Sequence, residues 1–95
     1  MKVVWNATAL SEFERGIARI QEENPEAARK VASAVLEAVE RLLDGRFDGP
    51  IIKLSDGREV RHWWVDPFHV LYVRHPGAVR ILRVYHHSRR PLWKP

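Results

Sequence analysis

A dense group of ionisable side chains follows the last strand-like stretch of the sequence. After the apolar run of residues 81–85 come His86 and His87, and then, one serine later, Arg89 and Arg90. Histidine titrates near neutral pH and can act as a general acid or base, and arginine can hold a phosphate with two hydrogen bonds. Cleavage of RNA by its own 2′-hydroxyl requires such groups beside the scissile phosphate. The alternative is a solvated basic tail without a chemical role.

Two tyrosines and three cations elsewhere in the second half of the sequence could join this group. Tyr72 and Tyr85 could be acid–base groups or stacking platforms, although a strand tyrosine is more often half-buried packing. Lys53, Arg58 and Arg61 cluster where a strand-rich region begins. These cations could contact phosphate, or they could simply be solvated.

The residue types and their spacing give little support for a metal or cofactor site. All five histidines lie in the second half, but no H-E-x-x-H or similar spacing occurs, and no carboxylate accompanies the histidine pair. The sequence has no cysteine, which excludes disulfides and thiolate catalysis and fits a reducing cytoplasm. It also lacks a Gly-rich phosphate loop and a nucleophile elbow. We therefore expect no metal and no cofactor.

Length and charge narrow the class of protein further. The 95 residues predict one domain, 1–95, and no apolar run approaches the roughly 20 residues of a membrane span. The start of the sequence lacks the apolar region of a signal peptide, so we expect a cytoplasmic protein without a membrane partner. Residues 1–50 carry seven Lys/Arg against nine Asp/Glu, whereas residues 51–95 carry nine against three. The basic second half indicates a polyanionic or acidic partner.

Two helices are predicted for the first half, after a short strand over residues 2–5. Asn6 is a good N-cap, and apolar residues spaced by three and four positions mark one helix face over residues 10–20. The Asn24-Pro25 pair ends this helix and starts a second one, which we expect over residues 25–44. Gly45 then stops it, so that the two helices form an antiparallel hairpin.

Three strands are predicted for the second half, after a partly extended loop over residues 46–57. They span residues 58–65, 68–74 and 79–87, and their short connections predict an antiparallel meander. The expected fold is α+β with the order β-α-α-β-β-β, in which the N-terminal strand and the helical hairpin pack on one face of a small, mainly antiparallel sheet. The position of the first strand in the sheet stays open.

Alternation along the strands assigns side chains to the two faces of this sheet. We predict that Val60, Leu82 and Val84 point to the helices. The residues then expected on the open face are Arg61, Trp63, Arg83 and Tyr85. A basic and aromatic face of this kind suits gripping phosphates and stacking on bases.

Five motifs in this order resemble the RelE/ParE superfamily of bacterial toxins, the toxin halves of type II toxin–antitoxin modules. The motifs are W-N-A-T-A-L at 5–10, E-N-P-E-A-A at 23–28, G-R-E-V at 57–60, V-L-Y-V-R at 70–74 and I-L-R-V-Y-H-H-S-R at 81–89. The last is the most specific, because Arg83, His86 and Arg89 fit an apolar–Arg–apolar strand followed by a His and then an Arg three residues later. The resemblance covers nearly the whole chain.

The resemblance implies one of two activities. The helix break and the closing strand are more similar to the ParE-like branch, whose members inhibit DNA gyrase, and we favour that function slightly. In that branch Gly commonly follows the His, whereas this sequence has His87. RelE-like members instead enter the ribosomal A site and cut messenger RNA. The residues that would serve such an endoribonuclease here are Arg61, Arg83, Tyr85, His86, His87 and Arg89.

The resemblance also implies partners and a role. The expected partners are a cognate antitoxin and either DNA gyrase or the ribosome with its mRNA, and the expected role is growth arrest and plasmid stabilisation. The candidates for contact with the target or with nucleic acid are Lys53, Arg58, Arg61, Arg83, Arg89 and Arg90. A non-toxic module of the same fold that binds nucleic acid or protein is the remaining alternative.

Overall fold

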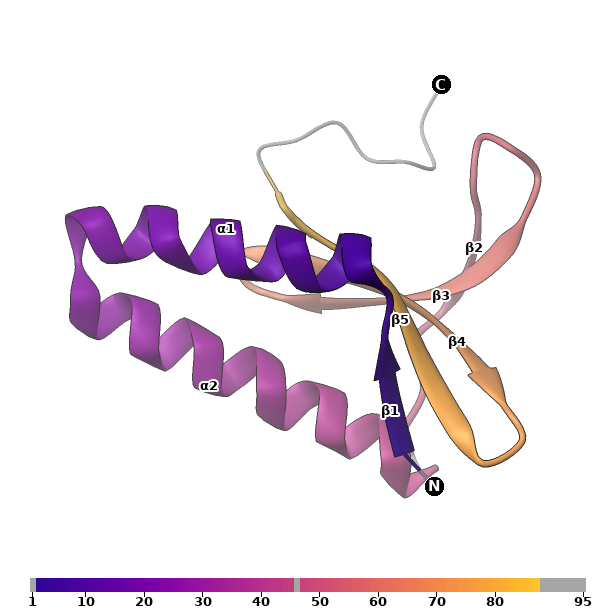
Figure 1. Ribbon diagram of the computed structural model, residues 1–95. Coiled ribbons are helices and arrows are strands. Elements are labelled where there is room, and N and C mark those ends of the chain that lie inside the picture. The colour runs from indigo at the N-terminus through magenta and orange to yellow at the C-terminus, as the bar shows by residue number, and fades with distance from the viewer. Residues whose placement is uncertain (1, 46, 88–95) are drawn as a thin grey trace.

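A computed structural model describes residues 2–45 and 47–87 of the chain (Figure 1). The elements are, in order, β1 (Lys2–Trp5), α1 (Ala7–Glu23), α2 (Pro25–Arg41), the 3-10 turn η1 (Leu42–Asp44), β2 (Ile51–Lys53), β3 (Glu59–Val65), β4 (Phe68–His75) and β5 (Ala78–His86). The predicted α+β fold is confirmed. The structure has one strand more than predicted, β2, which lies within the stretch expected to be a partly extended loop.

The strands form one sheet in the order β1-β5-β4-β3-β2. β1 pairs in parallel with the first half of β5, from Lys2 opposite Ala78 to Trp5 opposite Ile81, and the remaining neighbours are antiparallel. The first strand is therefore an edge strand beside the last one.

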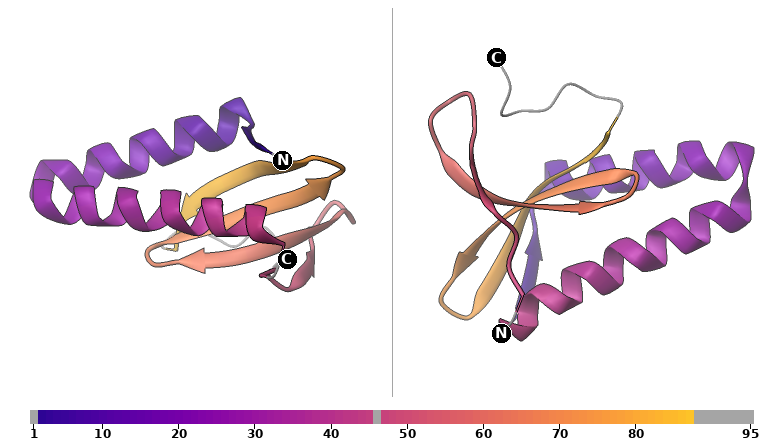
Figure 2. Two further views of the ribbon diagram at one scale, coloured as in Figure 1. Left: turned by 90° about the horizontal axis from the view of Figure 1, so that it is seen from below. Right: turned by 180° about the vertical axis from the view of Figure 1, so that it is seen from behind.

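The two helices lie side by side on one face of the sheet, as the views from below and behind show (Figure 2). Asn24 joins them: its backbone N–H donates to Ile20 O at 2.8 Å, and its side-chain oxygen accepts from Ala27 N at 3.1 Å. The predicted stop at Gly45 is confirmed, because this glycine adopts φ 76°, a conformation that other residues avoid. No helix in the described parts of the chain is long and apolar enough to cross a membrane.

A close approach between α1 and β4 sets the packing of this layer. The ring of Phe68 lies directly on Gly16, since a Cβ built on that glycine would lie 2.5 Å from the Cε1 atom of the ring. The sequence marks Gly16 only as a weak point in a helix, whereas the structure shows that the missing side chain makes room for an aromatic core residue. Phe68, Tyr72 and Ile81 are fully buried in the core below the helices.

Candidate functional site

The predicted assignment of strand faces is partly wrong. Val60 and Leu82 belong to a second apolar cluster that contains no helix residue, on the side of the sheet away from the helices. Trp63, predicted on the open face, packs against the helix-side core and lies 3.9 Å from Phe47 between ring centroids. Val84 points to the helices as predicted.

A β-bulge explains part of this error. Tyr72 pairs with Ile81 and Leu71 pairs with Arg83, so Leu82 is an extra residue on β5 that shifts the alternation. Tyr85 does lie on the side predicted for it, but it is only 3% exposed. It therefore offers little surface to a substrate.

Arg83 is held by a carboxylate from α1. Its Nε and Nη2 donate to the two oxygens of Glu12 at 2.8 and 2.6 Å, and Val84 N donates to the same carboxylate at 3.1 Å. The hydrogen bonds that Arg83 donates to Glu12 are the largest cause of the raised pKa of Arg83. The charge of this predicted site residue is thus neutralised within the fold.

Arg61 is also held within the fold, by residues of the loop before β2. It donates to Gly49 O at 2.8 Å and lies 3.5 Å from the carboxylate of Asp48. Asp48 also accepts from Tyr72 at 2.7 Å and from Arg74 at 2.9 Å. Burial opposes ionisation of Asp48, but these hydrogen bonds and the two arginines outweigh it and keep its pKa below the usual value.

Tyr72 is a structural residue rather than an acid–base group. It is fully buried, and besides its bond to Asp48 its hydroxyl accepts from Gly49 N at 2.7 Å. Burial raises its pKa to about 12, so the hydroxyl keeps its proton at neutral pH.

The other predicted cations lie apart from Arg83. Lys53 and Arg58 are both exposed around the turn between β2 and β3, at the edge of the sheet opposite β1. Arg58 pairs with Asp56 at 2.8 Å. β4 separates their hairpin from β5, so these cations and Arg83 do not form one cluster. Arg89 and Arg90 lie outside the described residues.

His86 and His87 lie where β5 ends. Their rings stack with centroids 4.5 Å apart, and His86 meets the edge of Phe68 at 6.0 Å. The N–H of His87 donates to Pro67 O at 2.8 Å, which fixes the end of the strand against the turn between β3 and β4.

A cluster of rings that was not predicted from the sequence lies on the side of the sheet away from the helices. His62 and His69 share a hydrogen bond of 2.7 Å between Nε2 and Nδ1, and His69 stacks on Tyr85 and on Trp64. Trp64 is 58% exposed. Two-residue turns fix hairpin register, so the Asp66-Pro67 turn could have predicted that Trp64 and His69 face each other.

Burial lowers the pKa of both histidines in this cluster. For His62 the neighbouring His69 adds to the effect, and for His69 the charges of His87 and His86 add to it. The neutral rings are thereby favoured near neutral pH. Within the described residues, no three His, Asp or Glu side chains are grouped so as to hold a metal ion.

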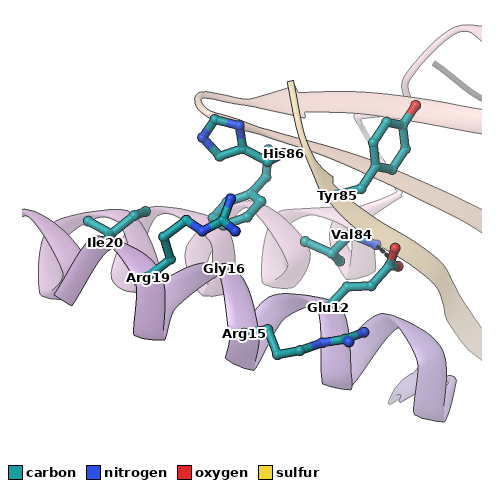
Figure 3. A pocket seen from close by; sticks show the side chains of 9 residues that line it. Glu12, Arg15, Gly16, Arg19, Ile20, Val84, Tyr85 and His86 are labelled. Atoms are coloured by element: carbon teal, nitrogen blue, oxygen red, sulfur yellow. Dashed lines mark hydrogen bonds between the residues drawn. The ribbon is translucent and has the colours of Figure 1, made fainter. Parts of the chain in front are cut away.

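A cavity of about 310 Å³ lies between α1 and the end of β5 (Figure 3). Its walls are Glu12, Arg15, Gly16, Arg19 and Ile20 from α1, Phe68 from β4, and Val84, Tyr85 and His86 from β5. Arg19 extends over Gly16 in the direction of His86, while Arg15 turns along the helix (Figure 3).

The comparisons with known proteins agree with this fold. A solved structure described as the chromosomal ParDE TA system from P. aeruginosa superposes with a TM-score of 0.71 at 21% identity, covering 90% of this chain and 95% of that one. No curated protein sequence matches the chain. The family model described as the ParE toxin of the type II toxin–antitoxin system parDE matches residues 3–91. The chain therefore belongs to the ParE toxin family of type II toxin–antitoxin systems.

Proposed function

We propose that this toxin arrests growth by inhibiting DNA gyrase, and that it does not cut messenger RNA. The observation that carries the proposal is the state of the two arginines that a nuclease would use. Arg83 is held by Glu12, and Arg61 is held by Gly49 and Asp48. Tyr85, the third candidate, is almost fully buried.

Phosphoryl transfer needs cations that can bind the phosphate and the charge that develops on it. Arg83 could offer its Nε and Nη2 donors to a phosphate only by leaving Glu12, whose side chain is 10% exposed. A nearly buried carboxylate without its partner is costly, commonly by about 3–5 kcal/mol in fully buried pairs. The nuclease mechanism therefore conflicts with the ion pairs of the fold, whereas inhibition by binding does not require them to open.

The partner we propose is a cognate antitoxin, in keeping with the ParDE toxin–antitoxin system named for the structural neighbour. We place both proteins in the cytoplasm, as the absence of cysteine suggests. For contact with gyrase we propose Lys53 and Arg58, which are exposed and lie outside the described core, together with Arg89 and Arg90, which follow the described residues.

One observation favours the nuclease as a second candidate. His62, His69 and the exposed Trp64 lie together on the side of the sheet away from the helices, and His87 lies near enough to His69 to influence its pKa. Imidazoles beside a stacking platform are groups that an RNA-cleaving site uses.

Two assays separate the candidates. Purified toxin is added to gyrase and relaxed plasmid, and transcripts are mapped by primer extension after induction in cells. Gyrase inhibition predicts a block in supercoiling, the DNA-damage response and no codon-phased cuts. Cuts within translated codons with normal supercoiling would overturn the proposal in favour of the nuclease.

A further inference from the structure

We propose that Trp64 is the platform of a site that binds an unpaired nucleobase of a single-stranded nucleic acid. The inference goes beyond the proposed function, because inhibition of gyrase does not require contact with a base. It involves no cleavage, and it depends only on the position and the surroundings of Trp64 at the end of β3.

Trp64 is one end of a stack of rings that crosses three neighbouring strands. Its indole stacks on His69 of β4 with centroids 5.7 Å apart and an angle of 18° between the planes, and His69 stacks on Tyr85 of β5 at 5.2 Å and 28°. Because His69 lies against one face of the indole, the other face is turned toward the edge of the sheet. Trp64 is 58% exposed, so this outer face is open to a further planar group.

The platform is fixed in place by its neighbours. Trp64 lies directly opposite His69 in the β3–β4 register, and the 2.7 Å hydrogen bond with His62 holds the ring of His69 in turn. A surface that is fixed before its ligand arrives loses little conformational freedom on binding. Stacking on an aromatic ring suits any base, because every base has a π-face.

The backbone of Trp64 adds polar groups at the same edge. His62 donates its N–H outward to Pro50 O at 3.0 Å, and alternate residues of an antiparallel strand face the same neighbour, so the N–H and C=O of Trp64 also point outward. The chain before β2 leaves this edge at Gly49, whose N–H donates to the buried Tyr72 hydroxyl. Within the described parts of the chain, no strand lies beside Trp64 at this edge. The polar edge of a stacked base would thus find one donor and one acceptor.

Charge and the length of the open edge favour a nucleic acid over a protein strand. Residues 51–95 carry nine Lys/Arg against three Asp/Glu, a balance that attracts phosphates. β3 ends at Val65 and its outer edge is occupied as far as His62, so an added peptide strand would gain the hydrogen bonds of a single residue. A base inside a duplex is stacked between its neighbours, so the base bound here must be unpaired.

The test uses the full-length toxin and three fluorescein-labelled single strands of ten nucleotides. The probe is oligothymidylate, the control is an abasic strand with the same phosphates, and oligouridylate distinguishes RNA from DNA as the source of the base. Anisotropy titrations are run with the wild type, with Trp64→Leu, and with Trp64→Tyr, which keeps an aromatic ring. Ile51→Ala, a matched loss of an exposed apolar side chain on the neighbouring β2, is the control variant.

The wild type should bind oligothymidylate at least about tenfold more tightly than the abasic strand, which is about 1.4 kcal/mol. Trp64→Leu should lose this preference, whereas Trp64→Tyr and Ile51→Ala should keep it. Oligothymidylate should also shift the indole N–H signal that is missing from the NMR spectrum of Trp64→Tyr. Equal or tighter binding of oligouridylate, with the same loss in Trp64→Leu, would show that RNA can supply the base.

Three results would overturn the inference. They are equal binding of oligothymidylate and the abasic strand by the wild type, an unchanged preference in Trp64→Leu, and an indole signal of Trp64 that responds to the apolar peptide acetyl-Leu-Val-Leu-amide but not to the oligonucleotide. The last result would mean that the platform takes a protein side chain.

The gyrase assay keeps this result apart from the proposed function. A preference for bases that depends on Trp64, found without any inhibition of gyrase, would overturn only the proposed function. Inhibition of gyrase by a wild-type toxin that shows no preference for bases would overturn only the stacking site.

Discussion

Glu12 on α1 and Arg83 on β5 form a two-point ion pair, with N–O distances of 2.8 and 2.6 Å, and the same carboxylate takes the backbone N–H of Val84. β1 accompanies β5 only as far as Ile81, so beyond that point no strand from the described part of the chain lies along the outer edge of β5. The side chain of Glu12 therefore does for Val84 what a sheet partner does for other residues. This one carboxylate ties the helical layer to the sheet.

Replacing Glu12 by glutamine should lower stability, because the change removes the negative charge beside Arg83 and replaces one of its two acceptor oxygens by an amide donor. We expect Glu12→Gln to reduce the free energy of unfolding by about 1–3 kcal/mol, less than for a fully buried pair since Arg83 is 36% exposed. Urea denaturation measures this change. Glu14→Gln, an exposed change on the same helix, is the control, and equal losses for the two variants would contradict the prediction.

Acidification should destabilise the fold through His62 and His69. The pKa of each is below the usual 6.5, first because of burial and then because of neighbouring imidazoles. Between 6.5 and the lower folded pKa the unfolded chain binds more protons, so stability falls as the pH falls. Thermal melts from about pH 7 to about pH 5 should show a falling Tm.

The control for this pH dependence is another histidine. His62→Gln should flatten the profile, because it removes one of the two rings whose pKa is lowered by folding. His75→Gln, an exposed change at the end of β4, should leave the profile unchanged. Asp48 does not interfere, because its lowered pKa starts from 3.8 and its contribution is lost only at more acid pH.

A methyl group on Gly16 should destabilise the protein despite favouring the helix. Alanine gains about 1 kcal/mol over glycine within a helix. Here its Cβ would lie 2.5 Å from the buried Phe68 ring, and overpacking of a core costs about 1–3 kcal/mol. We expect urea denaturation to show a lower free energy of unfolding for Gly16→Ala than for the wild type. The loss caused by Gly16→Ala should be smaller when it is measured in a Phe68→Leu background. Ala18→Gly, at an exposed position of α1, measures the difference in helix propensity between alanine and glycine without a change in core packing.

Loss of the paired arginines near the C-terminus should abolish toxicity without unfolding the protein. We expect Arg89→Ala with Arg90→Ala to prevent growth arrest and to change the free energy of unfolding by less than about 0.5 kcal/mol, the usual range for substitutions that do not touch the core. A plate assay of growth is paired with thermal melts of the purified variant. Full toxicity would mean that these cations only solubilise the protein, and the contact must then be sought at Lys53 and Arg58.

Most of the architecture could be predicted because it depends on local patterns. Apolar residues at helical spacing marked α1 and α2, Asn24-Pro25 marked the break between them, and Gly45 marked the end. β2 was less visible, since it is only three residues long and contributes few apolar contacts.

The faces of the sheet were harder to predict, for two physical reasons. Apolar clusters lie on both sides of the sheet, so alternation alone does not say which side meets the helices. The bulge at Leu82 then reverses the alternation part of the way along β5, and no glycine or proline marks it.

The site depended on contacts that a linear sequence does not display. Arg83 meets Glu12 and Arg61 meets Asp48 only after the chain has folded, and these pairs convert predicted binding cations into structural ones. Counting charges identified a basic half but could not say which cations remain available. The His62–His69 contact, in contrast, could have been predicted from the register of the β3–β4 hairpin.

The parallel pairing of β1 with β5 has a consequence for the newly made protein. β1 leaves the ribosome well before its partner segment, which runs from Ala78 to Ile81. Such distant pairing is slow to form, because a long loop must close before the contact is gained. The sheet is thus completed only after β5 has been made, so that a copy of this toxin translated only through β4 lacks the finished sheet.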